Sequence, residues 1–524
     1  MEHVELVVLF LLVAVAALTA LARVLGVPYP ILLVIGGSLV GFAPGVPDVE
    51  LDPELVLFIF LPPLLFNAAY FSSLRDLRAD MRSITLSAIG LVLLTTAAVA
   101  VVAHAAIGGL PWAAAFALGA IVSPTDPLAA TAIARRLGVP RRLTAIIEGE
   151  SLVNDGTALV AYRTAVVAVG GTFDLLDATG DFIVNVVGGI AFGVVAALVL
   201  VEIFKRIVAD DLVGVVLSLA CGYIAYLPAE RLGVSGVLAA VAVGLIVGRR
   251  SPELSTAASR LRGYAFWEVL VFLLNATLFV LVGLQLPAIL AEQEHTTAEL
   301  AGYGVLVSVV VIASRLVWGN TAPYVIRAID RRPAQVARRV GWRPRMVVSW
   351  SGLRGAVSLA AALALPGDFP ERGLLIFLTL CVIFATLVVQ GLTLPLLIRR
   401  LGVQDDGAGE REELHARREA TAASIAHLGR LREEEWTRDE TVERMLGLYR
   451  FRDRRLRQRA GELSNGEDDD DLDERSHTYQ RMVREVLDAQ RRRVIELRNG
   501  GAISDDVLHV LERELDLEDQ RLEI

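Results

Sequence analysis

The segment ALGAIVSPTDPLAATAI, residues 117–133, carries an acid between two prolines inside an otherwise apolar run. Pro124 and Pro127 flank Thr125 and Asp126. Proline has no N–H to donate and disturbs the turn before it, so a helix through this segment is predicted to break. Carbonyl groups at the break lose their helical partners and become possible ligands for a cation. A simple proline kink does not require an acid, so the pattern indicates a functional break.

A second apolar segment is interrupted in a similar way. VVSWSGLRGAVSLAAAL, residues 347–363, holds Gly352, Arg354 and Gly355 in a Ser/Gly-rich centre. Paired breaks of this kind predict a secondary transporter built from inverted repeats, with its site where the repeats meet. The half-helix ends carry opposite partial charges. Asp126 therefore suits the positive N-terminal end of one half-helix, and Arg354 suits a negative C-terminal end.

The composition indicates an all-α polytopic membrane protein. The chain has 524 residues, of which 54% are hydrophobic, and its mean hydropathy is +0.54. A transmembrane helix needs about 20 apolar residues, with some tolerance. We predict about thirteen spans, near residues 4–22, 30–46, 54–71, 83–107, 112–134, 143–169, 182–204, 211–227, 234–248, 263–288, 302–327, 346–365 and 371–398. The breaks fall in spans 5 and 12, so spans 1–6 and 8–13 are predicted to be two inverted six-helix repeats in which the discontinuous helices 5 and 12 cross.

Loop charges predict the orientation. When the loops are taken alternately, one set holds 21 basic residues and the other holds two, Arg231 and Arg372. By the positive-inside rule the first set is cytoplasmic. The N-terminus is then outside, the C-terminal tail is inside, and the chain is a multi-pass protein of the cell membrane.

The charges also divide the chain into two domains. Residues 405–524 hold 32 acids and 22 arginines, whereas residues 1–404 hold 27 acids and 28 basic residues. We therefore predict a transmembrane domain over 1–404 and a charged, mainly helical cytoplasmic domain over 405–524, with an exposed break at 466–474. This tail is either a regulatory or dimer-stabilising domain or a solvated appendage.

The sixth span contains EGESLVNDGTAL, residues 148–159, with three carboxylates. A charge in mid-bilayer costs roughly 2.5–3.5 kcal/mol even on the lenient insertion scale, so these acids need a purpose. At roughly 100° per residue, the polar side chains of this stretch share one side of the helix, within roughly 160°. They are Glu150, Ser151, Asn154, Asp155 and Thr157. Asp155 lies near mid-span, where a carboxylate beside a hydroxyl and an amide predicts a site for either an alkali cation or a proton.

Another buried charge bears on the roles of these acids. Arg315 in the eleventh span needs an anion, and Glu150 is the natural candidate if spans 6 and 11 touch. That pairing would make Glu150 a structural anchor and leave Asp155 as the working carboxylate. Glu148 is predicted to lie near the cytoplasmic entry.

Four motifs resemble one known family. FLPPLLFNAAYF (60–71), SPTDPLA (123–129), EGESLVNDGTAL (148–159) and SGLRGAVSLA (351–360) appear in the order found in the monovalent cation:proton antiporters of the sodium/proton exchanger type. The resemblance covers roughly residues 1–400, and the tail matches only generically.

The resemblance implies both an architecture and a mechanism. It implies a homodimer in the lipid bilayer, with spans 1–3 and 7–10 as the dimer scaffold. Spans 4–6 and 11–13 would form a mobile core that carries the ion by elevator-like alternating access. The transported ions would be Na+ and H+, with no cofactor and no nucleic-acid partner.

The same resemblance implies roles for particular residues. Asp155 would be the cation/proton carboxylate beside Asn154, with Ser151 and the Thr125 backbone as further Na+ ligands, and Glu150 would pair with Arg315. An Asn before the Asp resembles the electroneutral branch, which exchanges one cation for one proton. One departure concerns Asn67, where many exchangers carry an acid, so selectivity or pH response can differ here.

Other functions remain open at this point. Exchange of K+, or of alkali cations broadly, for H+ fits the same fold, because hard oxygen ligands alone do not fix ion size. A cation channel is disfavoured, because no repeated filter sequence is present and a titratable site at mid-membrane suits competition better than conduction. A membrane enzyme is disfavoured further, because the sequence has no HExxH motif, no nucleotide-binding loop and no convincing Ser/His/Asp set.

Overall fold

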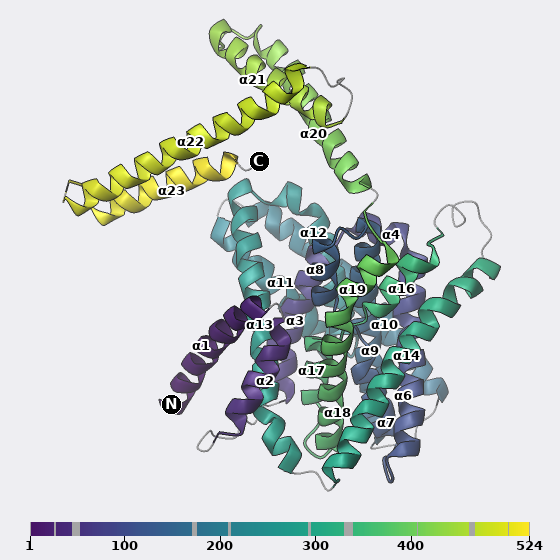
Figure 1. The fold of residues 1–524 in the computed structure, drawn as a ribbon. Coiled ribbons are helices and arrows are strands. Elements are labelled where there is room, and N and C mark those ends of the chain that lie inside the picture. The colour runs from purple at the N-terminus through teal and green to yellow at the C-terminus, as the bar shows by residue number, and fades with distance from the viewer. Residues whose placement is uncertain are drawn as a thin grey trace. The chain divides into compact units, whose positions relative to one another are not determined.

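The computed structural model describes most of the chain, and all regular elements in the described part are helices. The described residues are 2–25, 28–43, 53–169, 175–207, 211–291, 295–329, 339–405, 407–460, 467–500 and 502–522. The chain divides into two compact units, Met1–Asp405 and Asp406–Ile524 (Figure 1).

The first unit contains the apolar helices. They are α1 (Glu2–Leu25), α2 (Tyr29–Gly41), α3 (Pro53–Tyr70), α4 (Leu74–Ala79), α5 (Met81–Thr85), η1 (Leu86–Leu91), α6 (Val92–Ala106), α7 (Trp112–Val122), α8 (Pro127–Arg136), α9 (Arg141–Val169), α10 (Leu175–Ile207), α11 (Asp211–Arg231), α12 (Gly236–Leu254), α13 (Ala257–Ala291), α14 (Thr297–Ile329), α16 (Trp342–Trp350), α17 (Ala356–Leu363), α18 (Arg372–Ala385), η2 (Thr386–Gln390) and α19 (Gly391–Leu401). Within the described residues, six helices or continuous helix runs are long and apolar enough to cross a membrane. The count of thirteen spans stays a prediction.

These helices pack in two groups. The scaffold group comprises α1–α3 and α10–α13, in which α2 runs along α13 and α12 contacts α3, α10 and α11. The core group comprises α5–α9, α14 and α16–α19, in which α7 contacts α6 and α9, and α14 contacts α6, α16 and α18. Small residues allow the close contacts: a Cβ on Gly37 would lie 2.4 Å from the Val280 carbonyl oxygen, and one on Gly283 would lie 2.4 Å from that of Val34. Such small-residue interfaces are typical of helices that pack in a bilayer.

Both predicted breaks are present in the core group. One helix stops at Val122 and resumes at Pro127, and the other stops at Trp350 and resumes at Ala356. The two breaks touch, because the Asp126 N–H donates a hydrogen bond to the Leu353 carbonyl oxygen over 2.7 Å. Backbone groups freed by one interruption are thus satisfied by the other.

The second unit is a small helical assembly. It contains α20 (Ala408–Leu431), α21 (Asp439–Arg459), α22 (Glu467–Asn499) and α23 (Asp505–Leu522). Leu428, Val442 and Leu446 form a hydrophobic cluster between α20 and α21. Arg491 on α22 donates to Asp516 and Asp519 on α23 over 2.9 and 3.1 Å.

One prediction about this unit is wrong. The acidic stretch 466–474 was expected to be an exposed break, but residues 467–474 form the start of α22, and residue 466 lies outside the described residues. Acidic side chains at a helix N-terminus interact favourably with the macrodipole, so a run of acids there favours the helix.

Candidate cation-binding site

A cavity of about 250 Å³, here called the cation cavity, lies where the two breaks meet α9. Scaffold helices α3 and α13 form part of its wall, and the core elements α8, α9 and α17 form the rest. Its polar and charged lining residues are Asn67, Ser72, Thr125, Asp126, Thr131, Arg135, Glu148, Ser151, Asp155, Asn275 and Ser358. Three of the four predicted cation-site residues, Thr125, Ser151 and Asp155, are therefore brought together at one cavity. The fourth, Asn154, is buried but is not among the described residues that line it.

Asp155 is the buried carboxylate of this cavity. It is 8% exposed, and among the described residues its carboxylate has no hydrogen-bonding or ion-pairing partner. An ionised carboxylate is costly to bury unless it is paired with a cation or donor. A carboxylate in this position can bind a cation or carry a proton.

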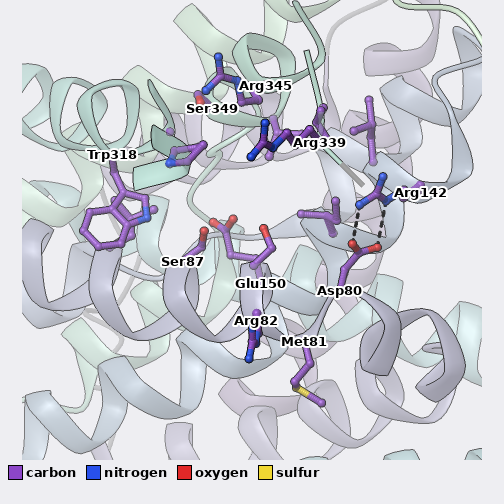
Figure 2. Close-up of a pocket in the computed structure, with 18 of the residues that line it drawn as sticks. Asp80, Met81, Arg82, Ser87, Arg142, Glu150, Trp318, Arg339, Arg345 and Ser349 are labelled. Atoms are coloured by element: carbon purple, nitrogen blue, oxygen red, sulfur yellow. Dashed lines mark hydrogen bonds and ion pairs between the residues drawn. The ribbon is translucent and has the colours of Figure 1, made fainter. Parts of the chain in front are cut away.

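Glu150 faces a different cavity. A second cavity of about 380 Å³ is lined by Arg142, Ile146 and Glu150 of α9, whereas Ser151 and Asp155 line the cation cavity (Figure 2). The sequence interpretation placed all the polar groups of α9 on one side within roughly 160°. An arc of this width can contact two different sets of neighbouring helices. Glu150 therefore lines one cavity and Asp155 lines another.

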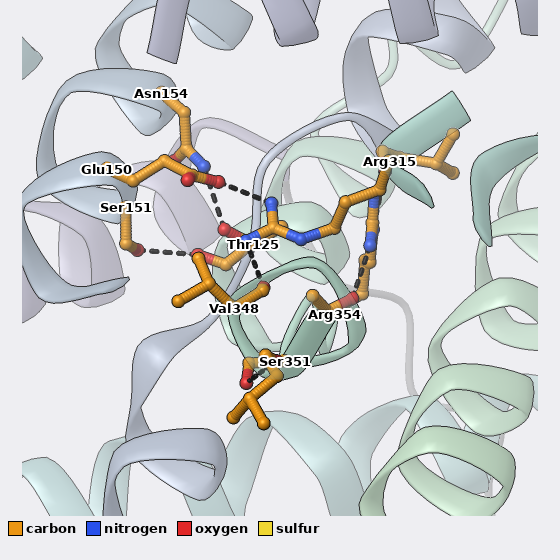
Figure 3. A network of polar contacts seen from close by, with 11 residues as sticks. Thr125, Glu150, Ser151, Asn154, Arg315, Val348, Ser351 and Arg354 are labelled. Carbon is orange, nitrogen blue, oxygen red and sulfur yellow. Dashed lines mark hydrogen bonds and ion pairs between the residues drawn. The ribbon is translucent and has the colours of Figure 1, made fainter. Parts of the chain in front are cut away.

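A short hydrogen-bond network fixes Thr125 at the break (Figure 3). The Ser151 hydroxyl donates to the Thr125 carbonyl oxygen over 2.5 Å, and the Asn154 amide donates to the Thr125 hydroxyl over 2.9 Å. Asn154 Oδ1 is buried and has no partner among the described residues. The Thr125 carbonyl was predicted to be free, but it accepts a hydrogen bond from Ser151, which was itself predicted to be a cation ligand.

Glu150 and Arg315 form a buried ion pair (Figure 3). Arg315 Nη1 on α14 donates to Glu150 Oε1, and the two residues are 2% and 3% exposed. Arg315 Nη2 also donates to the Val348 carbonyl oxygen over 3.3 Å. The predicted contact between spans 6 and 11 is thus present in the geometry, and it links α9 to α14 and α16. Removing one partner would leave an uncompensated buried charge.

Asp126 and Arg354 lie at half-helix ends. Arg354 Nε donates to the carbonyl oxygen of Val122, the last residue of α7, over 3.0 Å. The Asp126 carboxylate lies against Gly355, which precedes α17: a Cβ there would be 1.8 Å from Asp126 Oδ2. A cation at a helix C-terminus and an anion at an N-terminus are both favourable placements.

The edge of the cation cavity carries a third acid. Glu148 accepts a hydrogen bond from Arg135 on α8 over 2.6 Å, and its place at the cytoplasmic entry stays a prediction. Asn67, the departure from the family pattern, also lines this cavity and can therefore contact an ion or its water.

A family model described as "Sodium/hydrogen exchanger, transmembrane" matches residues 9–400, which contain both breaks and both cavities. The chain belongs to the sodium/hydrogen exchanger family. An uncharacterized Na+/H+ exchanger of Mycobacterium tuberculosis is 36% identical over 534 residues, covering 98% of this chain and 96% of the relative.

Two further relatives have more specific names. The Na+/H+ antiporter ApNhaP of Aphanothece halophytica is 35% identical over 435 residues, covering 82% of this chain and 81% of the relative. A sodium, potassium, lithium and rubidium/H+ antiporter of Bacillus pumilus is 31% identical over 444 residues, covering 81% of this chain and 66% of the relative.

A solved structure shares the fold. The sodium proton antiporter MjNhaP1 from Methanocaldococcus jannaschii, at pH 8, aligns with a TM-score of 0.59 and 18% identity, covering 76% of this chain and 99% of that one. This sodium/hydrogen exchanger is therefore a polytopic helical membrane protein of a cation/proton antiporter family. Its relatives are transporters rather than enzymes, and the family transports Na+ and H+.

Proposed function

We propose that this exchanger moves Na+ and H+ in opposite directions across the cell membrane, with Asp155 carrying either ion in turn. The proposal rests on the position of the Asp155 carboxylate. It is buried without a partner among the described residues, in a cavity where two interrupted helices meet. A group that holds a proton or a cation, but not both, couples the two fluxes.

The Na+ ligands in this proposal are oxygens of Asp155, Ser151 and Thr125. The Ser151 hydroxyl and the Thr125 carbonyl are hydrogen-bonded to each other over 2.5 Å. When Na+ binds, the hydroxyl proton must turn away so that both oxygens face the ion. Asn154 keeps its amide hydrogen bond to the Thr125 hydroxyl and so positions the break without lining the cavity.

Alternating access would come from movement of the core group against the scaffold group. The cation cavity lies at their boundary, because α3 and α13 supply one wall and α8, α9 and α17 supply the other. A core that slides past a fixed scaffold would expose Asp155 first to one side and then to the other. This elevator-like motion fits two inverted six-helix repeats with the site between them.

Fixed charges at the breaks would keep the core stable during this movement. In our proposal Arg354 compensates the negative end of α7, and Asp126 compensates the positive end of α17. Neither charge then has to change its partner during transport.

The way the carboxylates of α9 are paired supports our proposal of electroneutral exchange. Glu150 is held by Arg315 and Glu148 by Arg135, and the residue before Asp155 is the neutral Asn154. One carboxylate of α9 then remains for the cycle, which gives one Na+ for one H+.

We further propose a homodimer, formed by the scaffold group, with its N-terminus outside the cell. The alternation of basic loops supports this orientation. The residues after 404 would then form a cytoplasmic regulatory domain.

A second candidate is a broader alkali-cation exchanger. The Bacillus pumilus relative is named for sodium, potassium, lithium and rubidium. Hydroxyl, carbonyl and carboxylate oxygens would accept any of these ions if the cavity adjusts to their size.

The test is cation-driven proton flux in proteoliposomes. With a preset pH gradient, adding Na+ should dissipate the gradient in the absence of a membrane potential. Asp155→Asn should abolish this flux while the protein keeps its elution profile, because the amide cannot exchange a proton for Na+. Parallel additions of Li+ and K+ decide between the two candidates.

The matched control is Glu202→Gln, an acid-to-amide change on α10 where Glu202 pairs with Arg206 at an exposed site. It should leave the flux unchanged. Exchange that survives Asp155→Asn would refute the role of Asp155, and flux that requires a membrane potential would refute electroneutrality.

A further inference from the structure

The cavity on the Glu150 face of α9, here called the arginine cavity, has no part in the proposed exchange. It has a volume of about 380 Å³ and lies between α5 and η1, α9, α14 and α16 (Figure 2). Seven arginines and two carboxylates line it, a formal excess of five positive charges. Its volume is in the range of ligand pockets, about 300–1,000 Å³.

This charge excludes a cation path. A concave surface lined by one sign of charge focuses the potential and repels ions of that sign. The arginine cavity would therefore repel Na+ and concentrate anions. The charge of the cavity therefore favours a negatively charged ligand.

The two carboxylates of the cavity offset only two of its seven arginines. Asp80 accepts from Arg142 over 2.6 and 3.1 Å, and Glu150 accepts from Arg315. Arg345, by contrast, donates to the neutral Tyr324 hydroxyl over 3.2 Å. The formal excess of positive charge counts these two pairs.

Three buried donors at the cavity have no acceptor among the described residues. They are Arg345 Nη1, Trp318 Nε1 and Arg315 Nε, and all three residues line the cavity. A buried N–H without a partner is uncommon and costs free energy. Donors from α14 and α16 thus lie ready at a site whose charge favours an anion.

We propose that the arginine cavity binds a phosphate-bearing anion through Arg345, Trp318 and neighbouring arginines. A guanidinium presents a planar fork of donors that matches two phosphate oxygens, and such bonds are among the strong ones in proteins. The phosphate can belong to an anionic phospholipid, since basic pockets between membrane helices bind such headgroups, or to a free phosphate compound. Both sources would present phosphate oxygens to the arginines, and the experiment below uses a separate probe for each.

The test uses the full-length chain and two probes. In neutral detergent, inorganic pyrophosphate is titrated at constant ionic strength against sodium chloride, with the thermal unfolding midpoint as readout, because a ligand of the folded state raises that midpoint. In a second arm, nanodiscs of phosphatidylcholine are compared with nanodiscs that contain one-fifth phosphatidylglycerol. A saturable rise with pyrophosphate identifies a free phosphate compound, and a rise only with phosphatidylglycerol identifies a lipid headgroup.

Variants assign the effect to the cavity. Arg345→Gln and Trp318→Phe should each raise the apparent Kd roughly tenfold or more, since each removes a buried donor to a charged group. Arg400→Gln, at the exposed end of α19 and outside the cavity, should leave it unchanged. Elution profiles and Na+-driven exchange report whether each variant is folded.

Two results would overturn the proposal. One is the absence of a saturable rise with either probe. The other is equal weakening by Arg400→Gln and Arg345→Gln, which would reveal nonspecific attraction to a basic surface.

Discussion

The two cavities on either side of α9 differ more in charge than in size. The cation cavity is lined by three carboxylates and one arginine, and the arginine cavity by seven arginines and two carboxylates. Both are built against the same helix, and each takes a carboxylate from it. Asp155 has no partner among the described residues, whereas Glu150 is paired with Arg315.

The difference teaches that two buried carboxylates on one helix can have different partners, which is why we propose only Asp155 as the transport carboxylate. Glu150 and Asp155 are both at least nine-tenths buried. A permanent partner fixes the charge of Glu150 and makes it part of the architecture. In our proposal, the lack of a partner leaves Asp155 available to exchange a proton for a cation. Substitutions at Glu150 or Arg315 should therefore lower stability, whereas substitutions around Asp155 should lower transport.

The largest effect on stability is expected from Arg315→Met. The change leaves Glu150 buried with no partner, which should cost about 3–5 kcal/mol. The double variant Glu150→Met with Arg315→Met should recover most of the loss, since two apolar side chains of similar length can replace a buried pair. Thermal unfolding of the purified protein measures both. If Arg315→Met abolished exchange at unchanged stability, the ion pair would belong to the transport machinery and the comparison would fail.

The next effect is expected at the contact between the two breaks. A Cβ on Gly355 would lie 1.8 Å from Asp126 Oδ2, so Gly355→Ala must displace this carboxylate or the break itself. Overpacking of this kind costs about 1–3 kcal/mol, and we expect exchange to fall roughly tenfold or more.

Gly367→Ala is the control, because a Cβ at Gly367 has no neighbouring atom within 4 Å. Exchange rates in proteoliposomes should separate the two alanine variants. Equal rates would show that the breaks tolerate displacement of Asp126.

A smaller effect is expected from Ser151→Ala. The change removes the hydroxyl that bonds the Thr125 carbonyl oxygen and that we propose as a Na+ ligand. A lost hydrogen bond of about 1 kcal/mol corresponds to roughly a fivefold rise in KM for Na+. The control is Ser308→Ala, since the buried Ser308 bonds only the Gly304 carbonyl oxygen of its own helix in the described residues. An unchanged KM in Ser151→Ala would remove Ser151 from the ligand set.

The smallest effect on transport is expected from Arg345→Gln. Because Arg345 lines the arginine cavity and not the cation cavity, exchange without added phosphate should change by less than about twofold while anion binding is lost. Na+-driven flux in phosphatidylcholine liposomes, in a buffer without inorganic phosphate or pyrophosphate, measures this. A loss of exchange there would show that the two faces of α9 are not independent.

Much of the fold and of the cation cavity could be predicted from the sequence. Pro124, Pro127 and the Gly-rich stretch around Arg354 predicted both breaks, because proline and glycine act on the backbone locally. The charges of Asp155, Glu150 and Arg315 stood out because a bilayer makes each of them costly. Helical period placed them on α9 and α14 but left open which neighbour each would face.

The arginine cavity could not be predicted in this way. Its residues come from segments far apart in the chain, including Arg78, Arg142, Arg327 and Arg345. In the sequence these arginines served only to orient the loops. The sequence did hold one signal for this cavity: basic residues are concentrated in particular loops predicted to be cytoplasmic, such as those around 78–82 and 327–345. The loop charges were used only to assign the side of the membrane, and not to ask which loops lie together.

The sequence by itself determined what each segment costs to bury and where its helix must stop, because hydropathy and backbone chemistry act over a few neighbouring residues. Only the tertiary structure decided which partners these groups have. Arg354 reaches the Val122 carbonyl, Glu150 reaches Arg315, and Asp155 is left facing a cavity. These contacts join residues more than 150 positions apart, and their geometry arises only when the helices pack.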